Sequence, residues 1–199
     1  MSNIKIYSLN ISEVSSEDFT LWYSQMDEER KSSVDRLQNE DKRRSKIAAD
    51  ALCRKAISEN CNVPCSDIVF GKTEKGKPFT ENADVHFNIS HSGDIVVCAV
   101  SDKEIGTDIE KIRRINPRAA EKFASGKELE YIASADNGFF RIWTLKEAYF
   151  KCIGTGLGAD IKNVSFSIDG KQIRCSENGF ICFAEDLHKD YICSVCIKE

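Results

Sequence analysis

Two helix-forming stretches, each followed by short strand-like segments, most constrain how this chain can fold. Residues 17–59 are helical in composition, and apolar side chains at positions 47, 48, 51, 52 and 56 follow a nearly helical period. The stretch FFRIWTLKEAYFKCIG, residues 139–154, predicts a second helix that ends at Gly154. Each principal helix has its own strands, so the pattern predicts an α+β protein with two similar lobes, residues 1–101 and 102–199.

Strands are expected on both sides of the second helix. Those before it are KIYSLNI (5–11), the segment at 67–70, VHFNISHSG (85–93), DIVVCAV (94–100) and IGTDIEKI (105–112). Those after it are KNVSFSI (162–168), GFICFAEDL (179–187) and YICSVCI (191–197). We expect DIVVCAV and IGTDIEKI to form an antiparallel hairpin, and the polar residues 71–84 to form a loop.

Composition excludes several classes of partner. The 199 residues carry a net charge of −4, which gives no reason to expect nucleic acid or an anionic membrane as partner. We find no apolar run long enough to span a membrane and no signal peptide in MSNIKIYSLNISEV. Nine cysteines without a secretion signal favour reduced thiols and a cytoplasmic location.

Asp108 and Glu110 fit two interpretations. In a strand, alternate side chains share a face, so these carboxylates would lie about 7 Å apart, with Ile105, Thr107 and Ile109 on the other face. Like charges on one face repel each other unless water or a cation lies between them. The pair therefore fits a solvated edge strand, the commoner use of charged residues, or a metal site.

The second helix adds a third carboxylate. Trp143, Glu147 and Lys151 recur every four residues and so lie along one helical stripe. A packed tryptophan beside a surface Glu–Lys pair is the ordinary interpretation. Together with Asp108 and Glu110, however, Glu147 would complete an oxygen-rich site suited to Mg²⁺, which uses few protein ligands and substrate phosphates. Lys151 would then neutralise a phosphate as a point charge.

Two other segments indicate a phosphate-containing ligand. NISHSGD places Ser90, His91 and Ser92, all with donors suited to phosphate oxygens, at the end of a strand, although a lone histidine is more often structural. GKTEKGKP begins like a P-loop but has Pro78 where a P-loop needs Ser or Thr. We therefore reject a P-loop; the segment still fits a basic loop that lies near a nucleotide.

Taken together, these segments resemble the 4′-phosphopantetheinyl transferase superfamily, in its two-lobed surfactin-type (Sfp-type) branch. The matching segments are collinear: DKRRS at 41–45, GKP at 76–78, FNISHS at 87–92, IGTDIEK at 105–111 and WTLKEAYFKCIGTGL at 143–157. Thr107 stands where the family commonly has an aliphatic residue. The resemblance implies a pseudo-twofold arrangement of the two lobes, with a coenzyme A and Mg²⁺ site at their interface.

The resemblance also implies a reaction. The 4′-phosphopantetheine arm of coenzyme A would be transferred to a serine of an apo acyl or peptidyl carrier protein, releasing adenosine 3′,5′-bisphosphate, in fatty-acid, polyketide or non-ribosomal peptide synthesis. Asp108, Glu110 and Glu147 would hold Mg²⁺, with Mn²⁺ as the alternative cation. Asp108, Glu147 and Lys151 would be the catalytic residues, with Glu147 the best candidate to take the serine proton.

The implied coenzyme A ligands are basic, hydroxyl and loop residues: Arg44, Lys77, Pro78, Ser90, His91, Lys146 and Lys151. In this assignment Arg44 and His91 lie at the 3′-phosphate, the loop at 76–78 borders the adenine, and Lys146 supports the diphosphate or orients Glu147. KIRRINPR (111–118) is either a docking surface for an acidic carrier protein or an ordinary solvated basic loop. Two lobes in one chain favour a monomer.

Two rival functions use the same residues. An unrelated Mg²⁺-dependent phosphohydrolase would cleave coenzyme A or a related diphosphate without a carrier protein. A non-catalytic, coenzyme A-binding relative would be expected to have lost a metal carboxylate or Lys151, and all of these are present.

Overall fold

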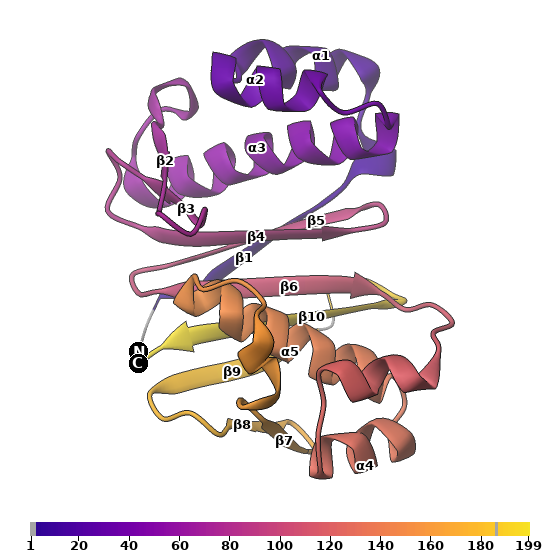
Figure 1. Cartoon of the computed structure of the whole chain (residues 1–199). Helices are drawn as coiled ribbons and strands as arrows, with labels where there is room; N and C mark the ends of the chain where they lie inside the picture. The colour runs from indigo at the N-terminus through magenta and orange to yellow at the C-terminus, as the bar shows by residue number, and fades with distance from the viewer. Residues whose placement is uncertain (1–2, 186) are drawn as a thin grey trace.

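The chain forms two lobes, each a three-stranded antiparallel sheet covered by helices (Figure 1). The computed structural model describes residues 3–185 and 187–199. The strand order is β1–β5–β4 in the first lobe and β6–β10–β9 in the second. The prediction of an α+β protein with two similar lobes is therefore confirmed.

The first lobe has its core between helix α3 and its sheet. Its elements are β1 (Lys5–Asn10), η1 (Ile11–Glu13), α1 (Ser16–Gln25), α2 (Glu28–Asp35), α3 (Glu40–Cys61), η2 (Cys65–Asp67), β2 (Phe70–Lys72), β3 (Pro78–Thr80), β4 (His86–Ser92) and β5 (Ile95–Ser101). Helix α3 begins after Asn39, whose side chain accepts a hydrogen bond from the Lys42 amide, and ends at Asn62 in the left-handed conformation. The buried face of α3 includes Ala48 and Ile57, which pack in one cluster with residues of β4 and β5.

The second lobe is organised around helix α5. Its elements are β6 (Ile105–Lys111), η3 (Pro117–Lys122), α4 (Lys127–Ser134), α5 (Gly138–Ile153), η4 (Ala159–Lys162), β7 (Phe166–Asp169), β8 (Gln172–Cys175), β9 (Phe180–Glu185) and β10 (Tyr191–Lys198). As predicted, α5 ends at Gly154, which takes a left-handed φ of 69°. Helix α5 lies against β6 and β10, and Figure 1 shows β6 beside β4 of the first lobe.

The predicted hairpin of DIVVCAV and IGTDIEKI is wrong. Strand β5 pairs with β1 and β4, whereas β6 crosses to the second sheet and pairs antiparallel with β10. Residues 105–109 of β6 are all buried, because the strand lies between the first lobe and α5. Gly106 allows this packing, since an added Cβ would lie 2.0 Å from the Ala148 carbonyl oxygen of α5.

The helical composition of residues 17–59 corresponds to three helices, α1, α2 and α3. Two other expectations need correction. Of the strand expected at 67–70, only Phe70 belongs to a strand (β2), whereas Asp67 ends the 3-10 turn η2; the loop expected at 71–84 contains the small hairpin of β2 and β3. Strand β8 was not predicted. The end of the predicted strand 179–187 includes residue 186, which lies outside the described residues.

The expectation that all nine cysteines are reduced is wrong for one pair. Cys182 and Cys196 lie directly opposite each other on β9 and β10 and form a disulfide. The other seven, all within the described residues, are free thiols. None of the helices in residues 3–185 and 187–199 combines the length and apolar character needed to cross a membrane.

Candidate functional site

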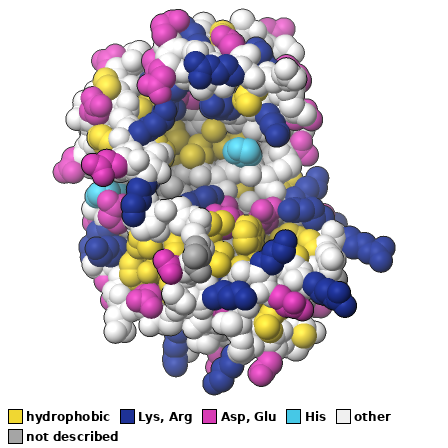
Figure 2. Space-filling view, in the orientation of Figure 1, with side chains coloured by type: hydrophobic (Ala, Val, Ile, Leu, Met, Phe, Trp, Pro, Cys, Tyr) yellow, Lys and Arg dark blue, Asp and Glu magenta, His cyan; other side chains and the backbone are white. Residues whose placement is uncertain are grey.

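The predicted residues Ser90, Asp108 and Lys151 come together where β4 of the first lobe runs beside β6 of the second. The backbone amide of Thr107 on β6 donates to the Asn88 side chain on β4 at 2.9 Å, and both residues are buried. Further along the same two strands, Ser90 donates to Asp108 and Ser92 donates to Glu110. Figure 2 shows this face of the molecule hollowed between the lobes, with apolar side chains inside the hollow and basic side chains along its rims.

Lys151, Asp108 and Ser90 form the centre of this site. The Lys151 ammonium donates to Asp108 Oδ1 at 2.6 Å and to Ser90 Oγ at 3.0 Å. The Ser90 hydroxyl in turn donates to Asp108 Oδ1 at 2.7 Å. The three residues come from α5, β6 and β4, so this constellation exists only when both lobes are in place.

The second oxygen of Asp108 is left without a partner. Oδ2 is buried and accepts no hydrogen bond among the described residues. Burial raises the pKa of Asp108 above its ordinary value, and the neighbouring Lys151 and Ser90 oppose that shift. A buried carboxylate oxygen without a donor is costly, so it is an available ligand for a cation.

Glu147 and Glu110 stand close to this pair. Burial, together with the charges of Asp108 and Glu110, raises the pKa of Glu147 to about 7, although Lys151 acts in the opposite direction. The Glu110 carboxylate accepts hydrogen bonds from Ser92 at 3.0 Å and from Arg113 at 2.8 Å. The three carboxylates thus lie near enough to repel one another.

Among the described residues, no three His, Cys, Asp or Glu side chains lie close enough together to coordinate one metal ion. The chemistry of the donors nevertheless fits Mg²⁺: the oxygens are carboxylates, Asp108 Oδ2 has no donor, and the negative charges of Glu147 and its neighbours disfavour one another. A hard cation would remove that repulsion. Lys151 and Arg113 now balance part of the charge.

His91 and Arg44 occupy different places in the first lobe. His91 lies on β4, one residue from Ser90; desolvation and the nearby Lys151 lower its pKa below the ordinary value. Arg44 lies on α3, where its guanidinium stacks on the Phe19 ring at 4.3 Å and donates to the Ile11 and Val14 carbonyls at 3.4 and 3.5 Å. Among the described residues, no hydrogen bond or ion pair joins His91 or Arg44 to the Lys151 constellation; His91 is near enough only for the charge of Lys151 to lower its pKa further than desolvation does.

The prediction that Lys146 supports the diphosphate is at odds with the position of its side chain, and the alternative, that it orients Glu147, stays a prediction. The Lys146 ammonium is fully buried and forms an ion pair with Glu128 at 3.0 Å. It also donates to the carbonyls of Ile161 and Val164 at 3.0 and 2.6 Å. Lys146 therefore lies inside the second lobe, because residues 161–164 and the first turn of α4 enclose it.

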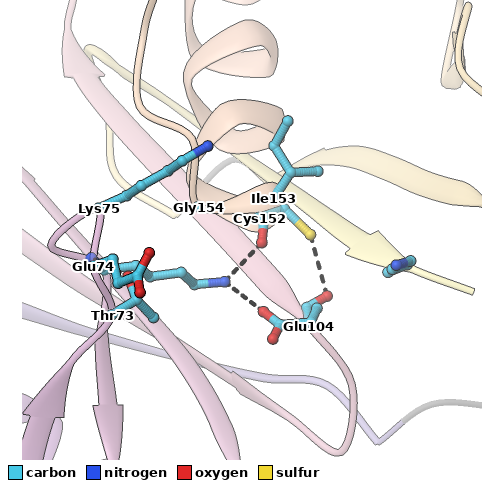
Figure 3. Close-up of a pocket in the computed structure, with 9 residues that line it drawn as sticks. Thr73, Glu74, Lys75, Glu104, Cys152, Ile153 and Gly154 are labelled. Atoms are coloured by element: carbon cyan, nitrogen blue, oxygen red, sulfur yellow. Dashed lines mark hydrogen bonds and ion pairs between the residues drawn. The ribbon is translucent and has the colours of Figure 1, made fainter.

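Lys77 and Pro78 lie at a second part of the lobe interface. A cavity of about 500 Å³ opens there between the β2–β3 turn, Glu104 and the end of α5 (Figure 3). The Lys77 ammonium forms part of its wall and donates to Glu104 Oε2 at 2.5 Å and to the Cys152 carbonyl at 2.7 Å. Pro78 begins β3 and is half-buried. The expected ligand role of the Lys77 side chain is thus at odds with its internal contacts.

A third hollow borders the basic segment that follows β6. It has a volume of about 700 Å³ and lies between residues 112–121 and the helices α4 and α5. Arg113 and Arg114 line it together with Leu129, Ile132 and Phe139. The hollow therefore combines positive charge with an apolar floor.

The contacts of several residues at this interface were not predicted. Asn88 accepts from the Thr107 amide of β6, and Ser92, expected only as a donor to phosphate, donates to Glu110 together with Arg113. Asn88 and Ser92 lie at alternate positions of β4 with Ser90, and that spacing was the available signal. Arg113 was expected only as part of a basic loop.

Comparisons with family models and with known proteins all match phosphopantetheinyl transferases. Residues 13–103 match a family model described as "4′-phosphopantetheinyl transferase, N-terminal", and residues 104–196 match the "4′-phosphopantetheinyl transferase superfamily" model. The chain is 38% identical to 4′-phosphopantetheinyl transferase gsp of Aneurinibacillus migulanus over 75% of this chain and 67% of the relative. It is 30% identical to 4′-phosphopantetheinyl transferase Sfp of Bacillus subtilis over 97% of this chain and 92% of the relative. A Xenopus laevis protein, L-aminoadipate-semialdehyde dehydrogenase-phosphopantetheinyl transferase, is 33% identical over 61% of this chain and 47% of that protein.

Proposed function

Because the chain belongs to the 4′-phosphopantetheinyl transferase superfamily, we propose that its lobe interface carries out a Mg²⁺-dependent transfer from coenzyme A. The enzyme transfers the phosphopantetheine arm of coenzyme A to a carrier protein. Residues 1–101 and 102–199 are the two lobes, and coenzyme A binds between them. The observation that carries this proposal is the constellation of Lys151, Asp108 and Ser90, which joins three elements across the interface and leaves Asp108 Oδ2 unpaired.

Asp108, Glu110 and Glu147 are the residues that would hold Mg²⁺, or Mn²⁺ in its place. The bound cation would supply positive charge against the diphosphate of coenzyme A. Two observations support this assignment: the unpaired Asp108 oxygen and the raised pKa of Glu147. Both indicate that the positive groups of the protein do not fully balance the negative charge of the site. Arg113, now on Glu110, would have to share that carboxylate with the cation.

The protein's own residues position the reacting groups and handle the proton. The carrier serine oxygen forms a bond to the β-phosphorus while the bond to the leaving adenosine 3′,5′-bisphosphate breaks. Lys151 stabilises charge on the diphosphate oxygens, and Ser90 and Asp108 hold its ammonium in place. With a pKa of about 7 before any ligand binds, Glu147 is suited to accept the serine proton near neutral pH.

Coenzyme A is bound mainly by the first lobe. Ser90 and His91 face the phosphates from β4, and the backbone of residues 76–78 with the Pro78 ring borders the adenine. Arg44 contacts the 3′-phosphate; its present bonds to two carbonyls are long, so a phosphate would compete with them effectively. Neutral His91 would gain a proton beside that phosphate.

An acyl or peptidyl carrier protein docks at the hollow beside the basic segment. Such carriers are acidic, and Arg113 and Arg114 offer complementary charge beside an apolar floor formed by Leu129, Ile132 and Phe139. The complete interface lies within one chain, which supports an active monomer. Seven of the nine cysteines are free thiols, which supports a cytoplasmic location, and the Cys182–Cys196 disulfide is the exception to that pattern.

Intact-mass spectrometry of an apo carrier protein tests this function. The enzyme, coenzyme A and Mg²⁺ should add one phosphopantetheine to the carrier, and EDTA should abolish the gain. Cleavage of coenzyme A without a gain on any acyl or peptidyl carrier would instead favour a phosphohydrolase. Intact coenzyme A and unmodified carriers would contradict the proposed reaction.

A further inference from the structure

A second lysine joins the lobes at the end of helix α5, and we propose that Lys77 positions Lys151 for transfer rather than binding coenzyme A through its side chain. The three groups involved are the Lys77 ammonium, the Glu104 carboxylate and the Cys152 carbonyl, here called the Lys77 clasp. The role of Lys151 in transfer rests on the proposed function, whereas the contacts of the clasp do not depend on that function.

The clasp ties together three segments that are far apart in the sequence. Lys77 belongs to the β2–β3 turn, Glu104 to the turn before β6, and Cys152 to the last turn of α5. The dashed lines in Figure 3 mark the bonds of 2.5 Å to Glu104 Oε2 and 2.7 Å to the Cys152 carbonyl oxygen. The Cys152 thiol also donates to the Glu104 backbone carbonyl at 3.2 Å, which closes the link from the other side.

The position of Lys77 suits the end of a helix. The last carbonyls of a helix have no partner within it and carry partial negative charge, so an ammonium there is favourable. Only 13% of the Lys77 side chain is exposed, and its stem packs on Gly154. A Cβ at Gly154 would lie 3.1 Å from Lys77 Cδ, so the small residue lets the lysine reach the helix end.

The clasp acts one residue away from Lys151. Fixing the Cys152 carbonyl fixes the last turn of α5, and with it the direction in which the Lys151 side chain leaves the helix. That side chain must reach Ser90 on β4 at 3.0 Å. Both Lys77 and Ser90 belong to the first lobe, so the clasp sets α5 against the lobe that Lys151 has to contact.

Hydrogen exchange in the free protein tests the clasp without coenzyme A or a carrier. Lys77→Met and Glu104→Gln should each speed exchange of the amides at 152–154 about tenfold, because the last turn opens more often. Lys103→Met removes an exposed lysine from the same turn as Glu104 and should leave these rates unchanged. The double variant should exceed the single ones by less than the product of their effects.

Kinetics separate positioning from ligand binding. Lys77→Met should lower kcat about tenfold while KM for coenzyme A changes less than about twofold, and Lys77→Arg should recover most of kcat. Unchanged exchange at 152–154, or a raised KM with unchanged kcat, would overturn the proposal. If the wild-type enzyme transfers nothing, the proposed function fails, whereas the exchange data still decide whether the clasp exists.

Discussion

Two lysines five residues apart on α5 form ion pairs that are built in opposite ways. Lys146 is fully buried and bonds to Glu128 and two backbone carbonyls, and Glu128 accepts further bonds from the amides of Phe166 and Ser125. Lys151 is 28% exposed. Its partner Asp108 keeps one buried oxygen without a donor.

This difference indicates that the Lys146–Glu128 pair stabilises the fold, whereas the Lys151–Asp108 pair can bind a ligand. A buried ion pair whose polar atoms all have partners has no capacity left for a ligand, and it fixes α4, α5 and the segment before β7 relative to one another. An incompletely satisfied pair at a lobe interface still has bonds to offer. The same residue types on one helix therefore support two different roles.

The largest effect is expected from breaking the satisfied pair. Glu128→Gln leaves the Lys146 ammonium buried without a counter-charge, so the free energy of unfolding should fall by about 3–5 kcal/mol. Chemical denaturation monitored by circular dichroism measures it. Adding Lys146→Met should recover part of the loss, because the double variant buries no uncompensated charge; a double variant less stable than Glu128→Gln would contradict this account.

Changing the other lysine should affect catalysis more than stability. Lys151→Gln keeps a hydrogen-bond donor but removes the charge, so transfer to a carrier should slow by about 10²–10³-fold. Its free energy of unfolding should fall much less than that of Glu128→Gln, because Asp108 can take up a proton when it loses its partner. Single-turnover transfer assays and denaturation curves make the comparison. The reverse ranking of the two variants would remove the distinction between the pairs.

The smallest expected effect is the titration of His91. In the free protein its pKa should lie below 6.5, because desolvation and Lys151 disfavour the charged ring. The unfolded chain then binds the proton more readily, so His91 contributes stability that is present above pH 6.5 and lost as pH falls through the folded pKa. NMR titration of the imidazole checks this. Coenzyme A should raise the midpoint, and the control His91→Asn should lose this part of the pH dependence.

The sequence predicted the two principal helices and most strands, because their periodicity extends over many residues. It did not predict which strand β6 pairs with. The face formed by Ile105, Thr107 and Ile109 indicates that one side of the strand is buried, but these residues do not indicate which neighbouring element covers it. The small strands β2, β3 and β8 were missed or misplaced because three or four residues give too little periodicity.

For the site, the sequence predicted that Asp108, Glu147 and Lys151 lie near one another, as they do in the structure, but it did not predict that Lys146 is enclosed in the second lobe. One residue along a helix is a rotation of about 100°, so Lys146 leaves the stripe that Glu147 and Lys151 share. That signal was available. The enclosure of Lys146 by Ile161, Val164 and Glu128 was not, because it depends on how a distant segment folds back over α5.

The most direct test of the proposed metal and proton-transfer site is Glu147→Gln. This variant removes one carboxylate charge and the proposed proton acceptor while keeping the size of the side chain. The account predicts that single-turnover transfer in Mg²⁺ falls at least about 10³-fold. In EDTA near pH 8, the unfolding temperature should equal or exceed that of the wild type, because a charge repelled by Asp108 and Glu110 is gone. Near-wild-type transfer by this variant would contradict the central claim.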